Sequence, residues 1–101
     1  MKILLVCNAG MSTSMLVQKM EAEAKKQNID LTIAAMPITQ ALKELDSWDV
    51  VMLGPQVRHQ LKAIQKASDI PVEVINMRDY GTMNGKKVFE DALKMLNESE
   101  K

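Results

Sequence analysis

The sequence predicts an α/β fold: one three-layer αβα domain over residues 1–101, built on a four-stranded parallel sheet in the order 2-1-3-4 with helices on both faces. Three observations support this prediction. Short apolar segments typical of strands alternate four times with amphipathic segments typical of helices, which indicates a parallel sheet with right-handed crossovers. The first apolar segment, Lys2–Val6, shows no polar alternation, as expected of a central strand covered on both faces. With that strand central, the chain reverses its direction of winding between strands one and three.

The elements in the first half of the chain are predicted from periodicity. A helix is expected over Met15–Gln27, where apolar residues recur at helical spacing, and Asn28 can end it in the left-handed conformation. Alternation over Ile29–Ala35 predicts the second strand. Pro37 then opens a short helix with one apolar face, formed by Ile38, Leu42 and Leu45.

The second half continues the same alternation. The apolar run Val50–Leu53 predicts a third buried strand, and Gly54-Pro55 starts a helix that continues to about Ala67. Val72–Ile75 is predicted as the fourth strand. The next segment, Asn76–Gly85, is expected to be a loop, and a loop of that length often has a function. The last helix is expected to bury Val88, Phe89, Ala92, Leu93 and Leu96.

Composition excludes several classes of function. The chain has 13 basic and 13 acidic side chains, so it lacks the basic surface typical of nucleic-acid-binding proteins. Aromatic residues, at 3%, are too few for a base-stacking platform. With one cysteine and one histidine in the sequence, we expect no metal site, and no other cofactor is indicated.

Cysteine content and hydropathy predict a cytoplasmic protein. A single cysteine cannot form an internal disulfide, which a secreted domain of this size would usually contain. No apolar run approaches the roughly 20 residues of a membrane span. The apolar stretch after Met1-Lys2 is too short for a signal peptide. We therefore expect no direct insertion into a membrane.

The residues that point to chemistry lie between the first strand and the first helix. Cys7 follows the strand, and a segment rich in glycine, serine and threonine leads into the helix. Backbone N–H groups and the positive end of the helix dipole would favour a thiolate and hold a phosphoryl group placed on it. Cys7 is therefore the predicted nucleophile, and the predicted phosphate-binding residues are Asn8, Ala9, Gly10, Met11, Ser12, Thr13 and Ser14.

Some of these residues also have purely structural interpretations. Ser12 can serve as a helix N-cap, and Gly10 can simply permit a turn. In a parallel sheet of order 2-1-3-4 the segment Gly54–Arg58 meets the cysteine loop. Arg58 can help to attract phosphate there or can equally form a surface salt bridge. Tyr80 either covers the site or anchors its own loop, and His59 is expected to be a solvated surface residue. Four methionines are assigned to core filling (Met20, Met36, Met52 and Met95), whereas Met11 and Met15 are candidates for contact with partners.

The cysteine loop resembles that of the low-molecular-weight tyrosine phosphatases, which have arginine and a hydroxyl residue after the cysteine and five intervening residues. Here Cys7 stands in the nucleophile's place and Ser14 in that of the hydroxyl residue, but Thr13 replaces the arginine. Arginine stabilises the charge on a phosphoryl group in its transition state, so its loss should greatly slow hydrolysis. A phosphocysteine formed here should persist and be available to another acceptor.

That combination resembles enzyme IIB of the phosphoenolpyruvate-dependent sugar phosphotransferase system, lactose/cellobiose type. The resemblance covers essentially the whole chain as a single IIB domain, and includes Cys7–Ser14, Gly54–Arg58 and Asp79–Gly85. It implies a phosphotransferase whose cysteine accepts phosphate from a phosphohistidine on enzyme IIA. The phosphate then passes to a sugar held by the membrane permease, enzyme IIC, and the resemblance favours a β-linked disaccharide such as cellobiose or chitobiose. It also implies transient association with the inner face of the membrane.

Two hypotheses from other classes remain. A phosphatase-like or arsenate-reductase-like hydrolase using Cys7 is disfavoured by Thr13 and by the lack of a second cysteine. A receiver or flavodoxin-like binding module could share the topology. A receiver, however, needs an acidic phosphate acceptor after a central strand, and neither Val6-Cys7 nor Leu53-Gly54 supplies one. The sequence does not fix the oligomeric state.

Overall fold

The structure, a computed structural model, describes residues 1–7 and 11–99 and contains one parallel sheet. Its four strands are β1 (Lys2–Val6), β2 (Thr32–Met36), β3 (Val50–Leu53) and β4 (Val72–Val74). They lie in the order β2-β1-β3-β4, with each neighbouring pair parallel. The predicted fold class and strand order are confirmed.

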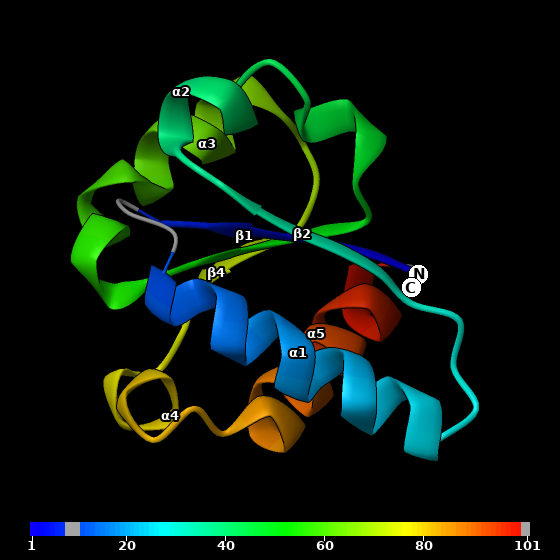
Figure 1. Ribbon diagram of the computed structural model, residues 1–101. Helices are drawn as coiled ribbons and strands as arrows, with labels where there is room; N and C mark the ends of the chain where they lie inside the picture. Colours follow the sequence, from blue (N-terminus) through cyan, green and yellow to red (C-terminus); the bar gives the residue numbers. More distant parts are fainter. Residues whose placement is uncertain (8–10, 100–101) are drawn as a thin grey trace.

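Helices cover both faces of this sheet (Figure 1). On one face lie α1 (Met11–Lys26), α4 (Met77–Gly81) and α5 (Gly85–Ser99). On the other lie α2 (Ile38–Ala41), the 3₁₀ helices η1 (Leu45–Ser47) and η2 (Pro55–Gln60), and α3 (Leu61–Ala67). Among the described residues, no helix combines the length and the apolar character needed to cross a membrane.

Alternate side chains of the two central strands enter two separate cores. Ile3 and Leu5 of β1 face the layer of α1, α4 and α5, whereas Leu4 and Val6 face the layer of α2 and α3. All four residues of β3 are buried in the same alternating way. Burial on both faces explains why Lys2–Val6 and Val50–Leu53 are continuously apolar in the sequence. Met20, Met36, Met52 and Met95 are buried, as predicted.

The first helix begins four residues earlier than predicted, at Met11 instead of Met15. Periodicity could not locate this start, because the apolar stripe that faces the core begins only at Leu16. The far end agrees with the prediction: Asn28 has a φ of 56°, in the left-handed region. The N–H of Ile29 then bonds the Ala24 carbonyl at 2.9 Å, which ends the helix.

Two further predictions in the first half need correction. The second strand begins at Thr32, not Ile29, because the partners of β1 start at the pair Lys2–Thr32. Leu42 is 42% exposed, so it does not share the inner face of its neighbours. The α-helix ends at Ala41, and Ala41 and Leu45 are the buried residues of this segment.

The predicted helix over residues 54–67 and the predicted loop over residues 76–85 are both wrong in detail. The first is a 3₁₀ helix followed by an α-helix, and Val57 breaks the helical geometry with a φ of −115°. The second contains α4, whose N-cap is Asn76: its side chain accepts hydrogen bonds from the N–H groups of Arg78 and Asp79. A five-residue helix is too short to show an amphipathic period.

Candidate functional site

Cys7 lies directly after β1, at the carboxyl edge of the sheet, and is 3% exposed. Its backbone position is fixed from both neighbouring strands. The N–H of Cys7 donates to the Met36 carbonyl at 3.2 Å, and the N–H of Gly54 donates to the Val6 carbonyl at 2.9 Å. The hydrogen bonds of the sheet thus continue past the ends of β1 and β3 and hold the cysteine between two strands.

The amino end of α1 follows Cys7 after three residues, so the helix starts near the carboxyl end of β1 (Figure 1). With 16 residues α1 has a full dipole, and its first turn contains no acidic residue that would compete for the positive end. Its last turn carries Lys25 and Lys26, which match the negative end. An anion at the amino end of α1 would therefore be stabilised.

The predicted phosphate-binding residues are placed only in part. Asn8, Ala9 and Gly10 lie outside the described residues. Met11, Ser12 and Thr13 form the start of α1, and Ser14 follows them in the same helix with an exposed side chain. The backbone of these four residues therefore forms the first turn of α1, instead of the segment before the helix in which the sequence analysis expected them.

Tyr80 lies beside the same edge of the sheet and is 7% exposed. A Cβ atom built on Gly54 would lie 3.6 Å from Cε2 of Tyr80 and 3.5 Å from the Val6 carbonyl oxygen. The tyrosine ring therefore packs against the residue that bonds the end of β1. Of the two roles left open for Tyr80, burial supports the anchoring role.

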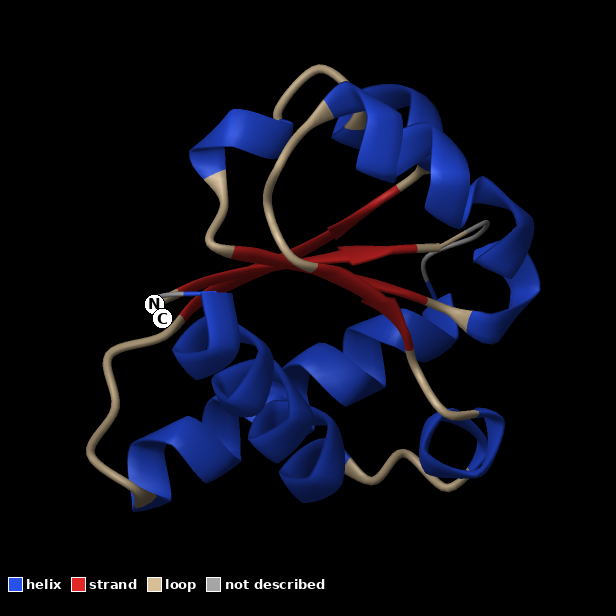
Figure 2. Cartoon of the chain, turned by 180° about the vertical axis from the view of Figure 1, so that it is seen from behind, coloured by secondary structure: helices blue, strands red, loops and turns tan. Residues whose placement is uncertain are grey.

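A groove next to this edge was not predicted from the sequence. It has a volume of about 660 Å³ and lies between η2 and α4, which face each other across the carboxyl ends of the strands (Figure 2). We call it the η2–α4 groove; its lining residues are Pro55, Gln56, Arg58, His59, Met77, Tyr80 and Gly81. The one sign of it in the sequence is the long segment after the fourth strand, but the groove forms only because part of that segment folds into α4.

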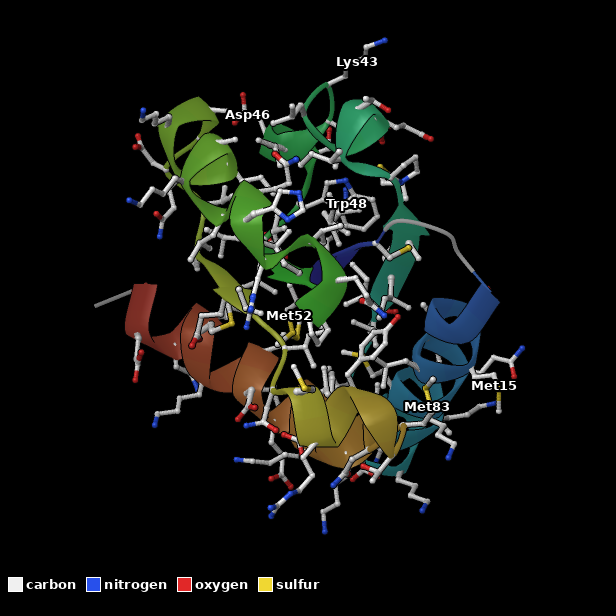
Figure 3. All side chains as sticks on the ribbon, turned by 90° about the vertical axis from the view of Figure 1, so that its left-hand side faces the viewer. Met15, Lys43, Asp46, Trp48, Met52 and Met83 are labelled. Atoms are coloured by element: carbon white, nitrogen blue, oxygen red, sulfur yellow. The ribbon has the colours of Figure 1, made fainter. Side chains whose placement is uncertain are left out.

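Exposed methionines flank the edge of the sheet on which Cys7 lies. Met77 in α4 is 68% exposed and Met15 in α1 is 55% exposed, although large apolar side chains are usually covered. Met83, from the connection between α4 and α5, is half-buried against the core and lies on the same side of the molecule as Met15 (Figure 3). His59 is exposed, as predicted, but it lines the groove.

Comparison with known proteins identifies the family. The family described as "PTS system, Lactose/Cellobiose specific IIB subunit" matches residues 2–91, which is most of the chain. The chain belongs to this IIB family. It is therefore a phosphotransferase of the sugar phosphotransferase system, in which IIB components work with IIA and IIC partners.

Similar proteins extend over nearly the full length of this IIB chain. The oligo-β-mannoside-specific EIIB component of Bacillus subtilis is 41% identical over 98 residues, covering 94% of this chain and 95% of the relative. The cellobiose-specific EIIB component and the galactose-specific EIIB component, from two Lactococcus lactis strains, are each 37% identical over 107 residues, with the same coverage of both chains.

Solved IIB structures share the fold of this chain. The cellobiose-specific IIB component of Borrelia burgdorferi is 50% identical, with a TM-score of 0.81 over 97% of this chain and 93% of that one. The lactose-specific IIB domain of Streptococcus pneumoniae has a TM-score of 0.84 over 94% of this chain and 96% of that one. At 15% identity, the second comparison concerns the fold alone.

Proposed function

We propose that this IIB carries phosphate on the sulfur of Cys7, between a phosphohistidine of enzyme IIA and a sugar bound by the permease, enzyme IIC. The observation that carries the proposal is the position of Cys7. It lies at the carboxyl end of a central strand, at the point where the chain changes its direction of winding, and the amino end of α1 follows. Ligands of such sheets bind at this place.

The proposed reaction consists of two displacements at phosphorus. The Cys7 thiolate attacks the phosphohistidine, so the S–P bond forms as the N–P bond breaks and histidine keeps the electron pair. A sugar hydroxyl then attacks the phosphocysteine; the O–P bond forms, the S–P bond breaks and the hydroxyl proton is released. Both steps depend mainly on positioning and on stabilising charge, which backbone N–H groups at the start of α1 would provide.

The phosphate oxygens would be held by the residues between Cys7 and the first turn of α1. In this proposal the backbone N–H groups of residues 8–13 form the cradle, and the hydroxyl groups of Ser12, Thr13 and Ser14 donate to the thiolate or to the phosphate. Thr13 in place of arginine supports transfer over hydrolysis, because position 13 supplies no guanidinium to stabilise attack by water.

The sugar and the cellular setting are also part of the proposal. Two similar proteins, at 50% and 41% identity, are named for cellobiose and for oligo-β-mannosides. We infer a β-linked disaccharide such as cellobiose as the acceptor. Residues 1–101 would act as one IIB domain in the cytoplasm and meet the permease transiently at the inner face of the membrane.

Phosphoryl transfer to Cys7 can be measured directly. The protein is incubated with enzyme IIA phosphorylated on histidine with radioactive phosphate, and the label on IIB is followed and mapped by mass spectrometry. We expect one acid-sensitive phosphoryl group per chain, on Cys7. The variant Cys7→Ser should be labelled far more slowly than the wild type, because a serine hydroxyl at neutral pH is a far weaker nucleophile than a thiolate.

Cys7→Ser is a suitable control because the two side chains differ by one atom and circular dichroism can verify that the variant folds. An unlabelled wild-type protein, or a variant labelled as fast as the wild type, would contradict the proposal. Rapid turnover of an aryl phosphate by the wild-type protein would favour a hydrolase instead.

A further inference from the structure

The η2–α4 groove lies close to the proposed nucleophile. Its first lining residue, Pro55, follows Gly54, whose N–H bonds the carbonyl of Val6 directly before Cys7. Its inner wall includes Tyr80, which packs against the same Gly54. A protein that brings a phosphoryl group to Cys7 from this side must therefore cover the groove.

The charge of the groove has one sign. Its lining includes the basic side chains of Arg58 and His59 and no acidic residue. Both side chains are exposed, and within residues 1–7 and 11–99 neither forms an ion pair. Beside them Met77 supplies exposed apolar surface. Such a surface suits a partner that combines acidic and apolar side chains.

Charge also distinguishes the two proposed partners. The cytoplasmic loops of membrane proteins carry an excess of lysine and arginine, so the face that a permease presents is expected to be basic. A basic surface of that kind would be repelled by Arg58. A phosphorylated donor carries added negative charge at its histidine, so it gains from approaching the same side chain.

We propose that the η2–α4 groove docks the phosphorylated donor, enzyme IIA, through acidic and apolar side chains of the donor, and that Arg58 distinguishes the donor from the permease. This inference rests on the proposed function and adds a separate surface to it. Cys7 serves both transfer steps, whereas the charge at Arg58 assists the first step only.

The test measures each transfer step separately in Arg58→Glu. With phosphorylated enzyme IIA as the variable substrate, reversal of this charge should raise KM about tenfold, while phosphorylation at saturating donor reaches the wild-type level. The effect should shrink as salt is added, because the charges are exposed. In the second step, the apparent affinity of phosphorylated IIB for permease-containing membranes should stay the same or increase.

Two variants control for charge and for position. Arg58→Lys keeps the charge and should resemble the wild type in the first step. Lys43→Glu makes the same charge reversal at an exposed residue that projects away from the groove, and it should leave KM for the donor unchanged (Figure 3).

An unchanged donor KM in Arg58→Glu, or an equal loss of affinity for donor and permease, would overturn the inference. Either result would leave phosphorylation of Cys7 itself intact. A wild-type protein that accepts no phosphate at saturating donor would instead remove the proposed function on which the inference rests.

Discussion

Cys7 and Tyr80 define the site at the scale of single residues. The main chain around Cys7 is bonded to β2 through Met36 and to β3 through Gly54, so the cysteine has little freedom of position. Tyr80 packs on Gly54 from the adjoining layer. Because phosphoryl transfer depends on position, a side chain that does not touch the phosphate can still affect the rate.

Truncation of Tyr80 should affect both stability and transfer. Tyr80→Ala removes a buried ring, which we expect to lower the free energy of unfolding by about 3 kcal/mol and to slow phosphorylation of Cys7 by loosening the edge of the sheet. Tyr80→Phe keeps the ring and should lose less stability and less transfer rate than Tyr80→Ala. Urea unfolding and initial rates with phosphorylated enzyme IIA measure these effects; an unchanged unfolding midpoint in Tyr80→Ala would contradict them.

The place of Cys7 was predictable from the sequence, whereas the burial of Tyr80 was not. A single cysteine between an apolar run and a glycine- and serine-rich segment has few structural interpretations. Tyr80 lies in a segment with no clear period, and its position depends on contact with Gly54, which is distant in the chain. Sequence patterns of local period cannot reveal such contacts.

At the scale of elements, the contact between α1 and α5 depends on one glycine. Gly85 is the first residue of α5 and is buried against α1. A Cβ atom there would lie 2.6 Å from Cβ of Lys19 and 2.8 Å from its backbone carbonyl carbon. Backbone atoms cannot rotate away, so a side chain at position 85 would force the two helices apart.

Gly85→Ala is therefore expected to lower the free energy of unfolding by about 1–3 kcal/mol, the usual effect of overpacking. Gly81→Ala is the matched control. A Cβ atom at Gly81 would meet no atom within 4 Å, so this variant should be neutral or slightly stabilising. Thermal or urea unfolding of both variants tests the difference, and equal stabilities would show that α1 and α5 do not pack as closely as described.

Short elements are the part of this fold that sequence patterns predict least well. Longer segments such as α1 and the buried strands have enough residues to show a period. The helices η2 and α4 contain six and five residues, and their form is set by Val57 and by the Asn76 cap. These two short helices make the groove, so the groove could not be predicted.

At the scale of the whole molecule, strand order decides where the site lies. The order β2-β1-β3-β4 makes β1 and β3 neighbours at the centre, and their connections leave on opposite faces (Figures 1 and 2). Cys7, the start of α1, and η2 therefore meet at one edge, while the N-terminus lies at the other end of the sheet. The alternation of strand and helix predicted the parallel sheet, and the two-sided apolar character of Lys2–Val6 predicted the central place of β1.

The fate of the phosphoryl group on Cys7 tests the account most directly. The phosphorylated protein is isolated, mixed with membranes that contain the permease, and followed with and without cellobiose. We predict that the phosphate stays on the protein without sugar and appears on the sugar when cellobiose is added. Release as inorganic phosphate at the same rate in both cases would mean that water is the acceptor, and would contradict the account.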